Sequence, residues 1–143
     1  MAACTFFGHR DCPDTVKEKL REALTDLIEH HGVNLFYVGN QGNFDAIARS
    51  VLGELKKQYP HIDCGVVLAY MPENKKESDL ISDAIAPEGL EFVHPRYAIS
   101  WRNEWMLKRS DYVLIYITHD WGGAYRYAEK AMRQSKWVRN LAE

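Results

Sequence analysis

Short apolar runs alternate with longer amphipathic stretches along this chain, and this alternation limits the fold more than any other feature. The clearest run is "YVLIYI" at residues 112–117, after "CTFF", "LFYV" and "CGVVLAY". Apolar residues at helical spacing fill residues 14–32 and 44–55. Continuous apolar runs are typical of strands buried on both faces. The pattern predicts an α/β fold with a single doubly wound, mostly parallel sheet and helices on both faces.

The remaining elements follow from the same patterns. Helical spacing continues over residues 98–111 and 124–134, and "WVRNL" at residues 137–141 predicts a closing strand. A short strand is expected at "EFVHP", residues 91–95. The polar stretch over residues 72–89 is expected to be a mobile loop or insertion, at most partly helical. A chain of 143 residues predicts a single domain over residues 1–143.

Composition excludes several classes of protein. The net charge is −2 and no basic block is present, so no nucleic acid is expected as a partner. No apolar run reaches membrane-spanning length and no secretory signal is visible, which favours a soluble, cytoplasmic protein without a membrane partner. His9 and Cys12 are too few ligands for a metal, so neither a metal nor a cofactor is expected.

Polar and glycine residues gather in the loops that follow the predicted strands. In parallel sheets, ligands bind outside the carboxyl ends of the strands, so these loops should surround one crevice. The candidate ligand-binding residues come from "GHR", "GNQGNFD" and "WGGA": Gly8, His9, Arg10, Gly39, Asn40, Gln41, Gly42, Asp45, Trp121, Gly122, Gly123 and Ala124.

Each of these motifs also has a purely structural alternative. The "GNQGNFD" loop precedes a helix and could offer backbone N–H groups to an anion, or it could only reverse the chain. It lacks the full G-x-G-x-x-G fingerprint, so a nicotinamide dehydrogenase has little support. His9 is either a structural residue or part of a site. Arg10 could clamp a phosphate with two donors.

The segment "SWRNEWMLKRSDYVLIYITHDWGGAYRYAE" resembles the signature region of the Lonely Guy phosphoribohydrolases. In both, a helical Arg, a Ser-Asp pair, an apolar strand, a glycine pair and a Glu follow in order; here the outer members are Arg102 and Glu129. The chain departs from the family where Trp121 replaces Pro, and where Tyr125 and Arg126 replace Gly and Thr. The layout is most similar to short bacterial and phage-associated members of the Rossmann-like SLOG superfamily.

The resemblance implies a nucleotide or nucleotide-derived small ligand, bound by a sensor or a sequestering protein. The alternative that it implies is a phosphoribohydrolase, in which Glu129 and Arg102 are the catalytic residues beside the ribosyl bond of a nucleoside 5′-monophosphate. A structural or protein-interaction domain is the second alternative. The incomplete glycine motif favours binding over turnover.

A homo-oligomer is expected, because the two helices near the motif carry more aromatic side chains than their packing needs: Trp101, Trp105, Tyr125 and Tyr127. Sedimentation at micromolar concentration should give a mass above the 16.6 kDa of one chain. A monomer alone at that concentration would contradict the expectation.

Overall fold

The computed structural model describes residues 2–70 and 84–143, in which six strands form one sheet. The strand order is β4-β3-β2-β1-β5-β6, and every neighbouring pair is parallel. The strands are β1 (Ala2–Gly8), β2 (Val33–Val38), β3 (Asp63–Val67), β4 (Ala84–Ile85), β5 (Tyr112–Tyr116) and β6 (Trp137–Asn140). The parallel α/β sheet predicted from the apolar runs is confirmed.

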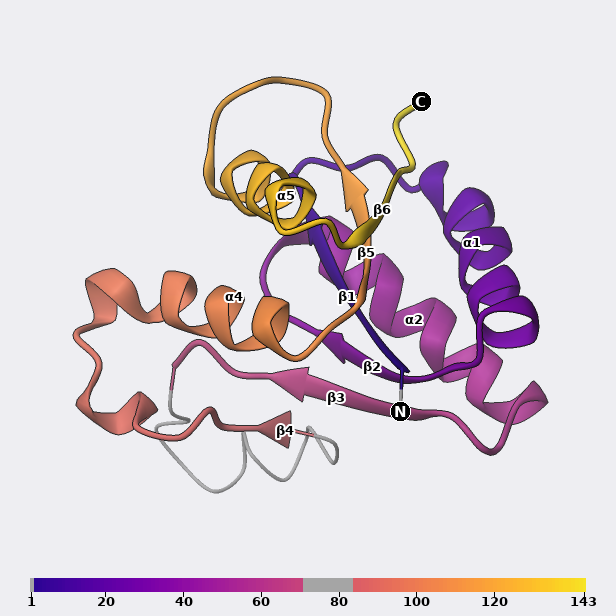
Figure 1. Cartoon of the computed structure of the whole chain (residues 1–143), viewed down its shortest axis with the longest axis horizontal. Coiled ribbons are helices and arrows are strands. Elements are labelled where there is room, and N and C mark those ends of the chain that lie inside the picture. Colours follow the sequence, from indigo (N-terminus) through magenta and orange to yellow (C-terminus); the bar gives the residue numbers. More distant parts are fainter. Residues whose placement is uncertain (1, 71–83) are drawn as a thin grey trace.

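Helices cover both faces of this sheet (Figure 1). They are α1 (Val16–His30), α2 (Gly42–Gln58), α4 (Ala98–Lys108) and α5 (Gly123–Arg133), with two short 3-10 helices, η1 (Leu90–Phe92) and η2 (Pro95–Tyr97). In Figure 1, α1 and α2 lie on one side of the strands and α4 and α5 on the other. Within the described residues, no helix is both long and apolar enough to cross a membrane.

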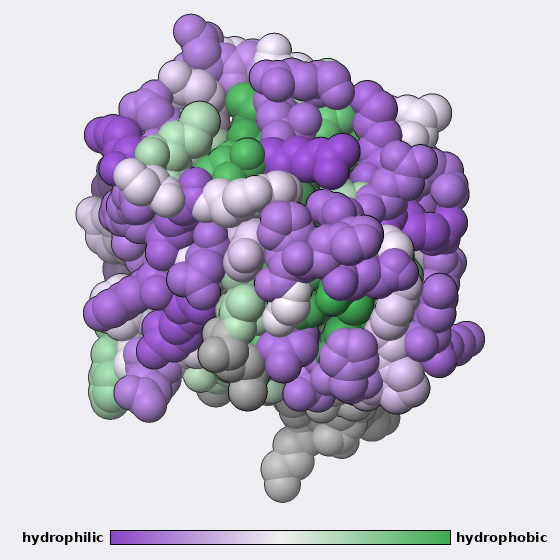
Figure 2. Space-filling model, turned by 45° about the vertical axis from the view of Figure 1, so that its right-hand side comes forward, coloured by the Kyte–Doolittle hydropathy of each residue, from purple (hydrophilic) through white to green (hydrophobic). Residues whose placement is uncertain are grey.

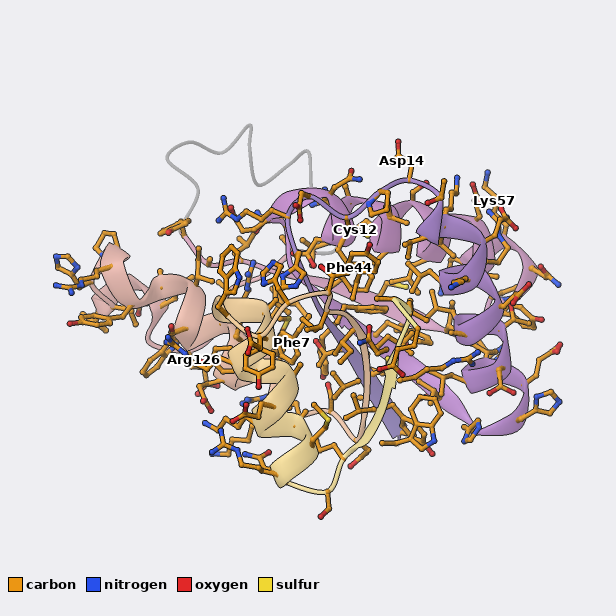
Figure 3. The ribbon with its side chains drawn as sticks, turned by 90° about the horizontal axis from the view of Figure 1, so that it is seen from above. Phe7, Cys12, Asp14, Phe44, Lys57 and Arg126 are labelled. Atoms are coloured by element: carbon orange, nitrogen blue, oxygen red, sulfur yellow. The ribbon has the colours of Figure 1, made fainter. Side chains whose placement is uncertain are left out.

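Adjacent residues of β1 belong to different cores, because side chains alternate across a strand. Phe6 packs edge-on against Phe44 of α2, with ring centroids 6.4 Å apart, in the core that α1 and α2 form with the sheet. Phe7 packs on the other side against Tyr127 of α5, at 5.6 Å. Figure 3 shows Phe7 beside α5 and Phe44 farther along, toward α1. The central strand is therefore buried on both faces, as its apolar run predicts.

The strand expected at residues 91–95 is wrong, because this stretch forms the two 3-10 helices instead. Gly89 has a φ of +81° immediately before η1, which turns the chain out of an extended path. Pro95 opens η2, and the His94 side chain accepts a hydrogen bond from the Arg96 N–H. The edge of the sheet is formed by β4, within the stretch expected to be a loop or insertion. The part of that stretch at residues 72–83 lies outside the described residues.

Two of the aromatic residues expected at an oligomer interface pack within the chain itself. Tyr127 lies in the core beside Phe7, and the Trp105 ring lies 5.2 Å from the Tyr37 ring. Trp101 is exposed. Polar side chains cover most of the face drawn in Figure 2, with hydrophobic atoms in small areas between them. The homo-oligomer therefore remains a prediction. Fewer of the four aromatic side chains are free for an interface than was expected from the sequence.

The order of the strands places a switch point beside β1. The chain runs from β1 to β2 and β3 on one side, and later fills the other side with β5 and β6. At the paired ends of β1 and β5, Gly8 lies opposite Tyr116. Connections leave these two strands toward opposite faces, so a crevice opens between them, as in other doubly wound sheets.

Gly8 offers a test of how tightly this region is packed. A Cβ atom at Gly8 would lie 2.3 Å from the Phe44 ring, whereas one at Gly53 in α2 meets nothing within 4 Å. We expect Gly8→Ala to destabilise the protein by about 1–3 kcal/mol through overpacking. The control Gly53→Ala should stabilise it by about 0.5–1 kcal/mol through helix propensity. Urea unfolding measures both changes, and a neutral Gly8→Ala would contradict the packing described here.

Candidate functional site

A pocket of about 480 Å³ lies at the carboxyl ends of β1 and β5. Its walls are the loops after these two strands, the first turns of α2 and α5, and one side of α4. Figure 3 views the molecule from above, toward this end of β1. The lining residues are Phe6, Phe7, Gly8, His9, Arg10, Asp11, Gln41, Asp45, Ile99, Arg102, Asn103, Met106, His119, Trp121, Gly122, Gly123 and Ala124.

Two buried residues of opposite charge, Arg102 and Asp45, line the pocket, and the charged groups of both lie next to Gly39. A Cβ atom at Gly39 would lie 2.7 Å from Arg102 Nη1 and 2.6 Å from Asp45 Oδ2. A side chain at position 39 would therefore push the two charged groups apart. Glycine is needed at this position for close approach rather than for an unusual backbone angle.

Arg102 is held in place by two asparagines from different elements. Its Nε donates to Asn103 Oδ1 at 3.3 Å, and its Nη1 donates to Asn40 Oδ1 at 3.4 Å. Only 4% of the residue is exposed. Burial lowers the pKa of the guanidinium, while the charge of Asp45 raises it. An arginine remains protonated in proteins, so this side chain brings a positive charge into the pocket wall.

Asp45 lies in the first turn of α2, and its Oδ2 accepts the Gln41 N–H at 3.1 Å. Burial raises the pKa of this carboxyl, opposed first by the charge of Arg102. Arg49 and Arg10 also favour its ionised form. The carboxyl group lies close to the guanidinium of Arg102, so the pocket wall has an acceptor next to a donor.

The loop after β1 is fastened to the start of α2. Asn43 donates its backbone N–H to the Arg10 carbonyl at 3.0 Å, and its side-chain amide donates to the Cys12 carbonyl and to Asp14. Gly42 has a φ of +83°, and a Cβ there would lie 2.9 Å from the Arg10 Cα. Because Gly42 has no side chain, the two loops can touch. This contact fixes the position of the Arg10 backbone, from which the Arg10 side chain extends.

Three aromatic rings stack from the interior to the surface at the pocket wall. The rings of His9 and His119 lie 3.6 Å apart and nearly parallel, and Trp121 stacks on His119 at 3.9 Å. His9 is buried, whereas 67% of Trp121 is exposed. We call these three residues the ring stack. It brings the long loop between β5 and α5, which arches above the sheet in Figure 1, onto the loop after β1.

His9 carries an unsatisfied group at the inner end of the ring stack. Its Nε2 is buried without a hydrogen-bond partner among the described residues. Burial lowers the pKa of the ring, His119 lowers it further, and Asp11 opposes both. His9 is therefore a neutral imidazole near pH 7, and a buried unpaired nitrogen costs free energy unless a ligand or water supplies a partner.

The first turn of α5 opens onto the same pocket. Gly122 has a φ of +95° and caps the helix without a side-chain hydrogen bond. A Cβ atom at Gly122 or Gly123 would meet nothing within 4 Å, so no described residue crowds these two positions of the pocket wall. Free N–H groups and the positive end of the helix dipole are favourable for an anion.

The structure brings together most of the residues that the sequence singled out. Gly39, Asn40 and Gly42 do not line the pocket, but they contact Arg102, Asp45 and Arg10, which do. The other candidates of the three loops line it directly.

Glu129 stands apart from this group. It is partly exposed on α5, where it lies 3.7 Å from Arg133 and hydrogen-bonds Tyr125, and it is not among the residues that line the pocket. Asn103 and His119 also line the pocket, although neither was expected to do so from the sequence. Asn103 is next to Arg102 in the sequence, and His119 lies in the polar loop just before Trp121. These neighbours could have suggested both residues as candidates, but the sequence gives no sign of their contacts.

Solved structures share this fold. DNA processing protein A from Streptococcus pneumoniae matches with a TM-score of 0.69 and 16% identity, over 96% of this chain and 49% of that one. DNA processing protein A from Helicobacter pylori matches with a TM-score of 0.67 and 14% identity, over 96% of this chain and 63% of that one. The present chain spans less than two thirds of either protein. At these identities the likeness shows the fold alone.

One of these structures corrects an expectation drawn from charge. The net charge of −2 and the lack of a basic block led to the expectation that nucleic acid is no partner. The Helicobacter pylori protein, which shares the fold, is described as having a unique single-stranded DNA binding mode. The expectation is therefore wrong: overall charge does not exclude nucleic acid, because a local surface can supply cations and stacking rings.

The family comparison covers nearly the whole chain. A profile described as the YspA SLOG family matches residues 4–141, and comparison with curated proteins gives no match. This match confirms the resemblance to SLOG proteins that was drawn from the arginine helix, the apolar strand and the glycine pair. The protein belongs to the YspA SLOG family.

Proposed function

We propose that the pocket binds a nucleotide or a nucleotide-derived small molecule, in a sensor or sequestering protein. The observation that carries the proposal is the buried guanidinium of Arg102, which faces the same pocket as the uncapped first turn of α5. An arginine and free helix N–H groups are both suited to a phosphate. Arg10 adds a second cation at the rim.

The same pocket offers contacts for a ring and a sugar. The ring stack supplies an aromatic wall for a heterocycle. Phe7 and Met106 add apolar surface below. A phosphate, a sugar and a base together use all of these features, whereas an inorganic anion uses only the charged ones.

Turnover has less support than binding. The phosphoribohydrolase alternative needs a carboxylate beside the ribosyl bond, and Glu129 lies on α5 beside Arg133 instead. The carboxylates that line the pocket are Asp11 and Asp45. Asp45 already hydrogen-bonds Gln41 and balances Arg102, which suits a binding group more than a nucleophile.

Single-stranded nucleic acid is a second candidate, favoured by the exposed outer ring of the stack. Trp121 presents an indole to solvent beside the pocket, and Arg126 is exposed in the first turn of α5, where Figure 3 labels it. Stacking of a base on an exposed aromatic ring contributes about 1–3 kcal/mol and is tolerant of sequence. The DNA-binding description of the Helicobacter pylori protein adds to this candidate.

A thermal-shift panel tests the small-ligand proposal. Nucleoside monophosphates, cyclic nucleotides, ADP-ribose and NAD should include at least one compound that stabilises the fold by about 2.7 kcal/mol at 100 times its dissociation constant. For a chain of this size that is a rise in melting temperature of about 5–10 °C. Arg102→Ala should abolish the rise, because the phosphate loses its buried partner.

Arg109→Ala is the matched control, because Arg109 is exposed just after the same helix and stacks on Trp105 away from the pocket. It should keep the full ligand-induced rise. The absence of any stabilising compound in the panel would refute the proposal. An equal rise in melting temperature for wild type and Arg102→Ala would show that the ligand's anionic group does not bind at Arg102.

Trp121→Ala tests the nucleic-acid candidate. We expect wild type to bind a single-stranded oligonucleotide in fluorescence anisotropy, and Trp121→Ala to weaken the affinity by about 5–100-fold through the loss of one stacked base. Trp101→Ala, which removes an exposed tryptophan that does not line the pocket, should leave the affinity unchanged. No binding by wild type, or an equal loss in both variants, would count against this candidate.

A further inference from the structure

The pocket contains a carboxylate that a phosphate-binding site does not need. Asp45 is 7% exposed and lies beside the buried Arg102, with Gly39 between them. Taking a carboxylate out of water is costly, so its presence needs a compensating partner. Arg102 and the Gln41 N–H supply part of this compensation. Asp45 also lines the pocket, so its carboxyl group is close to any ligand that binds there.

The charge of Asp45 restricts which part of a ligand can lie next to it. A phosphate against Asp45 would place like charges together in a poorly solvated site. The phosphate is therefore directed away from Asp45, toward the first turn of α5, whose residues Gly122, Gly123 and Ala124 line the same pocket. The group that approaches Asp45 must be a hydrogen-bond donor, and an ionised carboxylate accepts up to about four hydrogen bonds.

In a nucleotide, the donors nearest to the phosphate are the hydroxyl groups of the sugar. We infer that Asp45 binds the vicinal 2′- and 3′-hydroxyls of a ribose, so that the pocket selects ribonucleotides over 2′-deoxyribonucleotides. The inference rests on the proposed function and adds the sugar class. It gives Asp45 a role in specificity that Asn could not fill equally, because an amide has one acceptor oxygen where the carboxylate has two.

Paired ligands that differ only at the 2′ position test this inference. Calorimetry or ligand-observed NMR would measure the affinity of the wild-type chain for AMP, GMP, CMP and UMP, each against its 2′-deoxy partner. We expect the ribonucleotides that bind to do so at least about tenfold more tightly than their deoxy partners, as for a hydrogen bond to a charged group.

Asp45→Asn should reduce this ratio to about one, by weakening the ribonucleotides more than the deoxynucleotides. The variant keeps an oxygen for the Gln41 N–H, and circular dichroism checks that it folds. The matched control is Asp111→Asn, which removes an exposed carboxylate just before β5 that does not line the pocket, and should leave the ratio unchanged.

The outcomes separate the inference from the proposed function. Equal affinity of wild type for ribo- and deoxynucleotides would overturn the role of Asp45 and leave nucleotide binding intact. Binding of none of the monophosphates would overturn both. If Asp45→Asn does not fold, the wild-type comparison alone decides. If Asp45→Asn folds and still binds ribonucleotides tenfold more tightly than deoxynucleotides, other residues recognise the ribose and the inference is wrong.

Discussion

Burial of β1 on both faces is the constraint on which the rest of the structure depends. Phe6 and Phe7 hold different helical layers to the sheet, so α1 with α2 and α4 with α5 are positioned by neighbouring residues of one strand. The strand ends at Gly8, where Phe44 leaves no room for a side chain. Because the helical layers separate at this point, the open end of β1 is also the place where a ligand can enter.

The two buried charges are the second constraint, and they depend on the first. Arg102 comes from α4 on one face of the sheet, and Asp45 comes from α2 on the other. They approach each other only beyond the strand ends, beside Gly39. Each charge reduces the cost of burying the other, and both residues line the pocket. A fixed donor next to a fixed acceptor is an arrangement that discriminates among polar ligands.

The parallel sheet could be predicted from the sequence, because a continuous apolar run indicates a strand buried on both faces even when its tertiary contacts are unknown. It was also sufficient for the loops of the pocket, since every loop at a carboxyl end of a parallel strand faces the same edge. It failed at residues 91–95, where Gly89 and Pro95 determine local turns. Glu129, whose catalytic role the resemblance implies, is not among the residues that line the pocket, because distance along a motif does not fix which side of a helix faces a pocket. The contact of His9 with His119 joins loops 110 residues apart, and no local pattern reports it.

The ring stack bears on how a base could lie in this site. At 3.6 and 3.9 Å the rings are in van der Waals contact, so a base cannot enter between them without moving His119 or Trp121. A base on the proposed small ligand would therefore lie elsewhere in the pocket, for example against Phe7 and Met106, which also line it. A base of a longer nucleic-acid strand could instead stack on the exposed face of Trp121. The two proposed ligands would thus use different surfaces, and a nucleotide in the pocket would not of itself prevent a strand from stacking on Trp121.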